Sequence, residues 1–174
     1  MATSIKGVGF WAEAAGFLPG KEQVMTIDMT PMIPGSPVPV TQDSVILKKE
    51  MFFKYVIGAD YNFANSSYLN VQFLHGFANE RGRENLNDYF FVQYEMRFFE
   101  DRLKIDHVQG AFIVSDWGDV KNNYALIYSP EISFMATDNA EITISSAIFA
   151  GKGNNVFAQF TDYDMFLFGF KYSF

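Results

Sequence analysis

Twelve charged residues recur on one side of a two-residue alternation that runs through most of the chain. They are Glu13, Lys48, Glu50, Lys54, Asp60, Glu95, Arg97, Lys104, Asp106, Glu131, Glu141 and Lys171. Successive side chains of a β-strand point to opposite faces of a sheet, so these residues should share the face opposite the apolar one. In a narrow barrel they would pair across the lumen, because an unpaired buried charge is costly. In a wide barrel they would line water and set ion preference. Neither arrangement is catalytic.

The two histidines, His75 and His107, are the natural candidates for acid–base catalysis. A barrel-embedded hydrolase or acyltransferase would also need a serine and an acid nearby. Ser67 and Ser115 are present, but nothing in the spacing links either serine to a histidine. Both histidines have the apolar parity and lie near predicted strand ends, where an imidazole at a membrane interface is ordinary. We therefore predict no catalytic residue.

Four short loop motifs offer ligands without completing a site. Asp116-Trp117-Gly118-Asp119 and Asp162-Tyr163-Asp164 place carboxylates that calcium uses, but neither has a full ligand set. Gly151-Lys152-Gly153-Asn154 lacks the spacing and the Ser or Thr of a phosphate-binding loop. Arg81-Gly82-Arg83 is a basic patch that would meet lipopolysaccharide phosphates or simply water. The sequence predicts no metal site and no cofactor.

Composition narrows the class of protein. The chain has 174 residues, which suits one domain, and 49% of them are apolar, which excludes disorder caused by low hydrophobicity. The net charge of −7 makes nucleic acid a poor partner, because phosphate binding needs clustered Lys and Arg. The absence of cysteine excludes disulfides, thiolate metal sites and cysteine nucleophiles. No apolar run reaches about 18 residues, so no transmembrane helix is predicted. The first residues carry no basic-then-apolar signal segment.

Alternation with a period of two predicts about eight antiparallel β-strands. It is clearest near the C-terminus, where Phe166 and Phe168 alternate with Gly169 and Lys171. The predicted strands are 5–17, 45–63, 67–77, 88–99, 102–115, 122–135, 140–150 and 163–174.

Short and long connections alternate between these strands. The short turns lie at 64–66, 100–101 and 136–139, and the longer polar loops at 18–44, 78–87, 116–121 and 151–161. All short turns then fall on the same side as the C-terminus, which is typical of membrane barrels with long external loops. The loop 18–44 holds five of the six prolines and is predicted to be extracellular. The sixth, Pro130, predicts a bulge or a pairing gap inside a strand.

The size of the apolar side chains indicates which face points outward. Phe, Tyr, Leu and Met recur on the apolar parity of nearly every strand. The lumen of a barrel of about eight strands is only just filled by side chains, so these residues would overfill it, whereas lipid sets no such limit. Aromatic residues near the predicted strand ends would form interfacial girdles, or pack across strands in the ordinary way. They are Tyr61, Phe63, Tyr68, Phe98, Phe99 and Tyr172.

The last strand carries a pattern of its own. The chain ends in Phe174, with aromatic residues at every second position before it: Phe166, Phe168, Phe170 and Tyr172. This pattern resembles the C-terminal assembly signal of bacterial outer-membrane barrels. The resemblance implies that the barrel-insertion machinery is a partner.

Further segments resemble the C-terminal part of a proteobacterial porin-like outer-membrane β-barrel family of unknown function. They are Phe10-Trp11-Ala12-Glu13-Ala14, Tyr55-Val56-Ile57-Gly58-Ala59-Asp60-Tyr61, Leu69-Asn70-Val71-Gln72-Phe73-Leu74-His75-Gly76, Ser129-Pro130-Glu131 and Asp138-Asn139-Ala140-Glu141. Members of that family are longer barrels with a signal peptide. The resemblance therefore implies that the chain is a C-terminal segment, or a shortened version that closes on itself. It implies no catalytic residue.

The sequence thus predicts a single all-β domain over 1–174. It predicts an antiparallel transmembrane β-barrel with about eight strands in this chain, which either form a whole barrel or belong to a larger one. We expect a bacterial outer-membrane location, with lipid and lipopolysaccharide as partners and no nucleic acid. The expected role is a porin-like passive channel or a structural membrane barrel, not an enzyme. Two alternatives stay open: a soluble β-barrel that binds an apolar ligand, and a barrel-embedded lipid-modifying enzyme.

Overall fold

The computed structural model describes residues 2–28, 41–153 and 155–174, and in these ranges every long element is a β-strand. The strands are β1 (Ala2–Ile5), β2 (Val8–Phe17), β3 (Gln23–Asp28), β4 (Thr41–Leu47), β5 (Phe52–Asn62), β6 (Tyr68–His75), β7 (Asp88–Phe98), β8 (Leu103–Val114), β9 (Tyr124–Tyr128), β10 (Glu131–Thr137), β11 (Ala140–Lys152) and β12 (Met165–Tyr172). Three short 3-10 turns join them: η2 (Arg83–Asn85), η3 (Val120–Asn122) and η4 (Val156–Phe160). None of the helices in the described ranges is long and apolar enough to cross a membrane.

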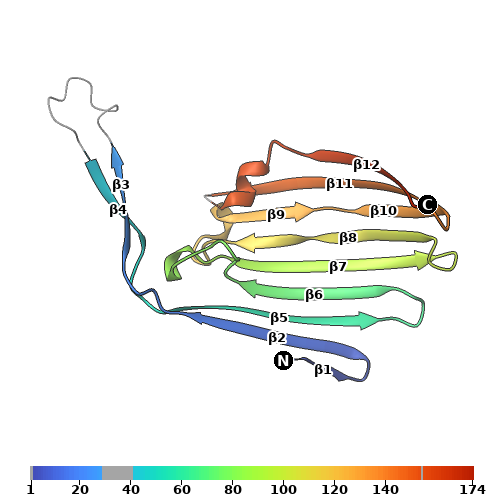
Figure 1. Ribbon diagram of the computed structural model, residues 1–174, viewed down its shortest axis with the longest axis horizontal. Helices are drawn as coiled ribbons and strands as arrows, with labels where there is room; N and C mark the ends of the chain where they lie inside the picture. Colours follow the sequence, from blue (N-terminus) through green and yellow to red (C-terminus); the bar gives the residue numbers. More distant parts are fainter. Residues whose placement is uncertain (1, 29–40, 154) are drawn as a thin grey trace.

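Ten strands form one antiparallel sheet (Figure 1). Its order is β1-β2-β5-β6-β7-β8-β10-β11-β12, and β9 lies in line with β10 between β8 and β11. Each of the eight predicted strands corresponds to a strand of this sheet, with β9 and β10 sharing one prediction. The all-β antiparallel fold is therefore confirmed. The pairings of the described strands leave β1 and β12 as the two edges of an open sheet.

The connections separate by length between the two ends of the sheet (Figure 1). The turns after β1, β5, β7 and β10 lie together with the C-terminus, and we call this side the turn end. The longer connections after β2, β6, β8 and β11 lie at the opposite side, the loop end. This is the distribution that the sequence predicted.

Between residues 18 and 63, the observed strands differ from the predicted ones in two places. Residues 18–44 are not all loop, because β3 pairs with β4 in a separate two-stranded sheet that extends away from the main one (Figure 1). The predicted strand 45–63 is divided, because three consecutive exposed charged residues at 48–50 break its alternation and β5 begins only at Phe52. Four of the loop's prolines lie outside the described residues: Pro31, Pro34, Pro37 and Pro39.

An additional N-terminal strand was also missed. Ala2–Ile5 folds back on β2 through a tight turn in which Lys6 and Gly7 have φ angles of 51° and 84°. This hairpin covers the edge of β2 from Val8 to Trp11.

Pro130 interrupts the sheet as predicted. It separates β9 from β10 and faces a register shift in β8, where His107 is the extra residue between two β7 pairings. The carbonyl of His107 accepts a hydrogen bond of 2.8 Å from the Tyr128 hydroxyl. Proline has no N–H to donate to a ladder, so a bulge opposite it spares the neighbouring strand an unmatched acceptor.

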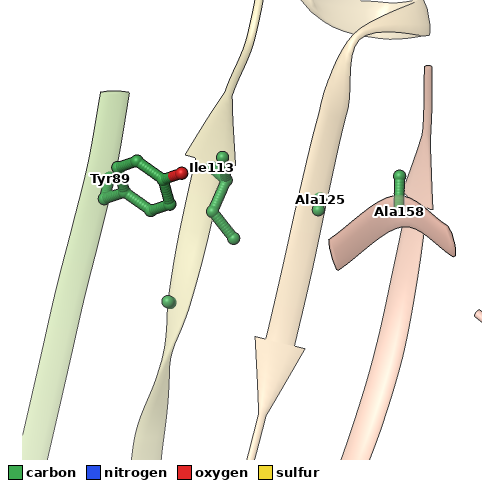
Figure 2. Close-up of a cluster of buried hydrophobic side chains, with 5 residues drawn as sticks. Tyr89, Ile113, Ala125 and Ala158 are labelled. Carbon is green, nitrogen blue, oxygen red and sulfur yellow. The ribbon is translucent and has the colours of Figure 1, made fainter. Parts of the chain in front are cut away.

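The two faces of the sheet are exposed to different degrees. On the apolar face, Phe53, Ile57 and Phe90 are 54%, 49% and 38% exposed. On the opposite face, the side chains are mostly half-buried, and a small core forms near the loop end, where η4 contacts β9 and β11. Figure 2 shows this core of Tyr89, Ile113, Ala125 and Ala158. The face that carries the charges is therefore the more buried of the two.

Candidate functional site

Ten of the twelve predicted charged residues lie on one face of the sheet, which we call the polar face. Cross-strand register places them there: Glu13, Lys54, Asp60, Glu95, Arg97, Lys104, Asp106, Glu131, Glu141 and Lys171. The other two, Lys48 and Glu50, lie in the connection between β4 and β5 instead. A hydrogen bond of 2.5 Å to the Glu84 carboxylate raises the pKa of the exposed Lys48 ammonium.

Uncharged polar side chains occupy the middle of the polar face. A row across four strands brings Asp60, Asn70, Gln93 and Gln109 into register. Along β6, Gln72 donates to Asn70 at 2.9 Å, and Asn70 donates to the Tyr68 hydroxyl at 3.2 Å. Such a row can present both donors and acceptors to solutes passing over it.

Two aromatic side chains also lie on this part of the polar face. Tyr68, predicted as a girdle residue, points to the polar face, where its hydroxyl donates to Asp60 at 3.4 Å. Trp11 lies flat over Gly58 of the adjacent strand, and a Cβ at Gly58 would come within 2.3 Å of the indole ring. Glycine is required at this position because the ring occupies the space of a side chain.

Charges toward the turn end are arranged in rows of one sign. Glu95 is in register with Asp106, and Asp106 with Glu131, so three carboxylates lie side by side. Arg97 and Lys104 form a neighbouring basic pair in the same way. Among the described residues, the ion pair between Arg97 and Glu95 is the one that joins two charges of the polar face. Like charges in register are unfavourable in a sheet unless other groups pair with them. Asp106, only 7% exposed, accepts a hydrogen bond of 3.0 Å from Gln93, and Glu95 accepts from Arg97.

The polar face ends in a hydrogen-bonded network at the loop end. The Lys54 ammonium donates to the carbonyls of Phe77 and Glu80, both at 2.5 Å. The Glu80 carboxylate accepts from the backbone N–H and side chain of Asn87 and from the Tyr89 hydroxyl. The network fixes the connection between β6 and β7 against the ends of β5 and β7.

A cavity of about 520 Å³ opens beside this network. Three long connections line it: the one between β6 and β7, the one between β8 and β9, and the η4 segment. Its wall includes Tyr89 and Phe157, which also belong to or pack on the core drawn in Figure 2. The cavity therefore lies at the loop end of the polar face.

Both histidines lie on the apolar face near strand ends, as their parity predicted. His75 contacts Asp88 at 2.6 Å and stacks on Tyr55, and the other carboxylate oxygen of Asp88 accepts from the Trp117 indole at 2.5 Å. His107 lies edge-on to Tyr94 at the turn end. These are contacts within aromatic clusters, and among the described residues neither ring is hydrogen-bonded to a serine hydroxyl.

The apolar face carries two further features. Phe166, Phe168, Phe170 and Tyr172 project from the edge strand β12, each more than half exposed. The last three are in register with apolar residues of β11, and Phe166 is in register with Ser146. A shallow hollow of about 670 Å³ is lined mainly by apolar residues of β1, β2, β5, β6 and β7.

The predicted loop motifs are used internally. The Asp116 carboxylate accepts from the Gly118 N–H at 2.7 Å, and Asp119 accepts from Asn122 at 2.9 Å. Asp164 accepts from the Phe149 N–H at 2.9 Å. Within the described ranges, no group of three or more His, Cys, Asp or Glu residues is placed to hold a metal ion. Gly151 and Lys152 end β11, and Asn154 lies outside the described residues.

Sequence reasoning did not identify the cavity residues as a group: it singled out Arg81, in a basic patch, and Ser115, as a serine that no spacing links to a histidine. The cavity residues come from three connections separated in sequence, and only the folded sheet brings those connections together. The one signal available was the frequency of asparagine in the loops at the same end.

No family model, curated protein or solved structure matches this chain.

Proposed function

We propose that this chain forms the wall of a transmembrane β-barrel, with its apolar face against lipid and its polar face toward an aqueous lumen. The observation that carries this proposal is the inverted burial of the sheet: every long strand exposes large apolar side chains on one face, while most charged and amide side chains of the other face are partly buried. Water would make the exposed apolar face unfavourable, whereas lipid tails match it.

Strand length supports the same environment. A strand that crosses the hydrocarbon core needs about 9–11 residues. The strands β2, β5, β7, β8 and β11 have 10, 11, 11, 12 and 13 residues. The resemblance to outer-membrane barrels points the same way, with short turns at one end and long loops at the other.

The polar face favours passive conduction over catalysis. Of its ten charged residues, six are acidic and four are basic, which gives an excess of negative charge. Charged rings in a pore set which ions pass, so we expect a channel that prefers cations.

The orientation of the faces can be tested with adjacent single cysteines, since the chain has none of its own. Val71→Cys lies on the apolar face and Gln72→Cys on the polar face of β6. In lipid vesicles, a nitroxide at 71 should collide mainly with oxygen, which dissolves in lipid, and one at 72 mainly with a water-soluble nickel chelate. Equal accessibility at both positions, or the reverse order, would contradict the proposal.

Conduction is tested separately in planar bilayers. Glu131→Lys changes the charge of the acidic row by two units and should shift the reversal potential toward anion selectivity. Glu100→Lys, in the turn between β7 and β8, makes the same charge change away from the face and should have a much smaller effect. A closed, non-conducting protein with correctly oriented labels would leave a structural barrel in place of a channel.

The apolar hollow supports a second candidate function, a soluble β-barrel that binds an apolar ligand. Its volume lies within the ordinary range for ligand pockets, and its lining is apolar. That barrel would fold in plain buffer and bury the apolar face inside. A label at 71 would then be protected from both oxygen and the nickel chelate.

A further inference from the structure

The cavity at the loop end contains the two buried side-chain groups that lack a hydrogen-bond partner among the described residues. They are the Ser115 hydroxyl and the Asn155 amide nitrogen, and both residues line the cavity. Buried polar groups in folded proteins are almost always paired, and an exception calls for a specific explanation. Both atoms lie just behind the cavity surface, so we infer that a small side-chain movement brings them to a partner that the cavity holds.

The orientation of the Asn155 amide is fixed by its other atom. Its Oδ1 accepts a hydrogen bond of 2.8 Å from the Ala158 N–H, which begins the η4 turn. Rotating the amide by half a turn would replace this acceptor with a donor, so the nitrogen must remain the unpaired group. Asn155 is only 5% exposed, and bulk water does not satisfy it.

Asparagine side chains supply acceptors around the same cavity. Asn85 and Asn123 each donate to a backbone carbonyl at 3.1 Å, and Asn87 donates to Glu80. These bonds use the NH₂ groups and leave the side-chain oxygens to accept. The cavity lining therefore contains both donors and acceptors, which is what a ligand with several hydroxyl groups requires.

The charges at the cavity are already compensated. Glu80 accepts four hydrogen bonds from neighbouring groups, and Glu84 pairs with Lys48. The remaining charged residue of the lining, Arg81, is exposed. Among the described residues of the lining, Arg81 is the one charge that an anion could meet, and bulk water already solvates it, so an uncharged ligand is favoured.

The aromatic residues and the size of the cavity complete the description. Phe77 and Phe157 provide ring surfaces for the C–H faces of a sugar, and the buried Tyr89 ring supports them from behind, edge-on to Phe157 at 6.3 Å. A volume of about 520 Å³ lies within the ordinary range for small-molecule sites. We propose that this cavity binds a neutral saccharide of one or two sugar units. That the saccharide is a solute on its way into a pore rests on the proposed channel function.

Binding can be measured on the full chain refolded in detergent, or in plain buffer if it folds there. Calorimetric titration with glucose, galactose and maltose tests neutral sugars, and glucose 6-phosphate tests the preference for an uncharged ligand. Ser115→Ala removes the unpaired hydroxyl. Asn155→Asp keeps the oxygen that caps η4 and removes the donor. As a matched control, Asn65→Asp makes the same change at the turn end, where the Asn65 oxygen accepts from the Ser67 N–H.

We expect at least one neutral sugar to bind, each cavity variant to weaken binding about tenfold, and Asn65→Asp to bind as the unmodified chain does. Because the Ser115 hydroxyl has no partner, Ser115→Ala should leave thermal stability unchanged, which separates a ligand contact from a structural role. Absence of binding by all three sugars, or binding that both cavity variants retain, would overturn the inference. Either result is independent of the spin-label pattern, so failure of the cavity and failure of the membrane proposal are distinguishable.

Discussion

At the scale of single residues, the carboxylate of Glu80 contributes more to the stability of the loop end than any ion pair there. Glu80 accepts from the N–H groups of Phe77 and Asn87, from the Asn87 side chain and from the Tyr89 hydroxyl. Lys54 reaches the same segment through backbone carbonyls and lies over the Phe17 ring. Lys54 is therefore an anchor of a loop, although its sequence position suggested a free charge in a lumen.

This arrangement predicts a clear difference between two glutamates of the same connection. Glu80→Gln should lower the free energy of unfolding by about 2 kcal/mol, because a charged acceptor with several donors is replaced by an amide. Glu84→Gln breaks only an exposed pair and should cost less than about 1 kcal/mol. Urea-induced unfolding of the refolded chain measures both. Equal losses in the two variants would show that Glu80 is not the anchor.

At the scale of elements, the pairing gap at Pro130 and the bulge at His107 form one device. At the bulge in β8, the His107 carbonyl accepts a hydrogen bond of 2.8 Å from the Tyr128 hydroxyl, so an acceptor opposite Pro130 has a donor. In lipid an unmatched carbonyl would be more costly than in water, because no solvent replaces the lost bond.

Tyr128→Phe should therefore destabilise the folded chain by about 0.5–1.5 kcal/mol, which is the net contribution of one hydrogen bond, because this bond lies at an exposed part of the sheet. Tyr172→Phe is the control, since the Tyr172 hydroxyl has no hydrogen bond among the described residues and should lose almost nothing. Thermal unfolding in detergent compares the two. A Tyr128→Phe chain as stable as the control would mean that the bulge carbonyl needs no partner.

Much of the sheet could be predicted because each strand is a local pattern. Alternation and turn residues are read over about ten neighbouring positions, so β7, β8 and β12 were found nearly to the residue. The hairpin of β3 and β4 was missed because the apolar residues of the strand ending at Leu47 continue the alternation of the strand that begins at Phe52. The two strands therefore looked like one. The cavity depends on contacts between Ser115, Asn155 and the connection after β6, and no local pattern contains these contacts.

At the scale of the whole molecule, the open edges determine how a barrel would close. Neighbours alternate in direction, so β1 and β12 run the same way, whereas β12 and β2 run in opposite directions (Figure 1). The β1 strand covers β2 only from Val8 to Trp11. Antiparallel closure within one chain would therefore join β12 to the remaining edge of β2. Closure is required in lipid because exposed backbone groups at a sheet edge have no partner there.

Deletions at the two ends should then have unequal effects. We expect a chain that closes its own barrel in detergent to migrate in electrophoresis as a compact species, whose mobility shifts on boiling. Removing residues 2–5 should leave this compact species. Removing Phe174 should impair insertion in cells, and removing 165–174 should abolish the compact species, because β12 supplies the closing edge. Loss of the compact species on removing only residues 2–5 would mean that β1 itself takes part in closure, and normal insertion without Phe174 would argue against the C-terminal assembly signal.

The Trp11 ring over Gly58 has a practical consequence. The chain has two tryptophans, and they lie in unlike surroundings: Trp11 covers a glycine at the middle of the polar face, whereas Trp117 is exposed and hydrogen-bonded to Asp88 on the apolar side. The fluorescence of the two tryptophans therefore reports two different folding events. With Trp117→Phe, the remaining signal follows the registration of β2 against β5. The fluorescence of the unmodified chain minus that of Trp117→Phe reports when Trp117 reaches its folded surroundings at the loop end. The two signals together give the order of these two folding steps without an added dye.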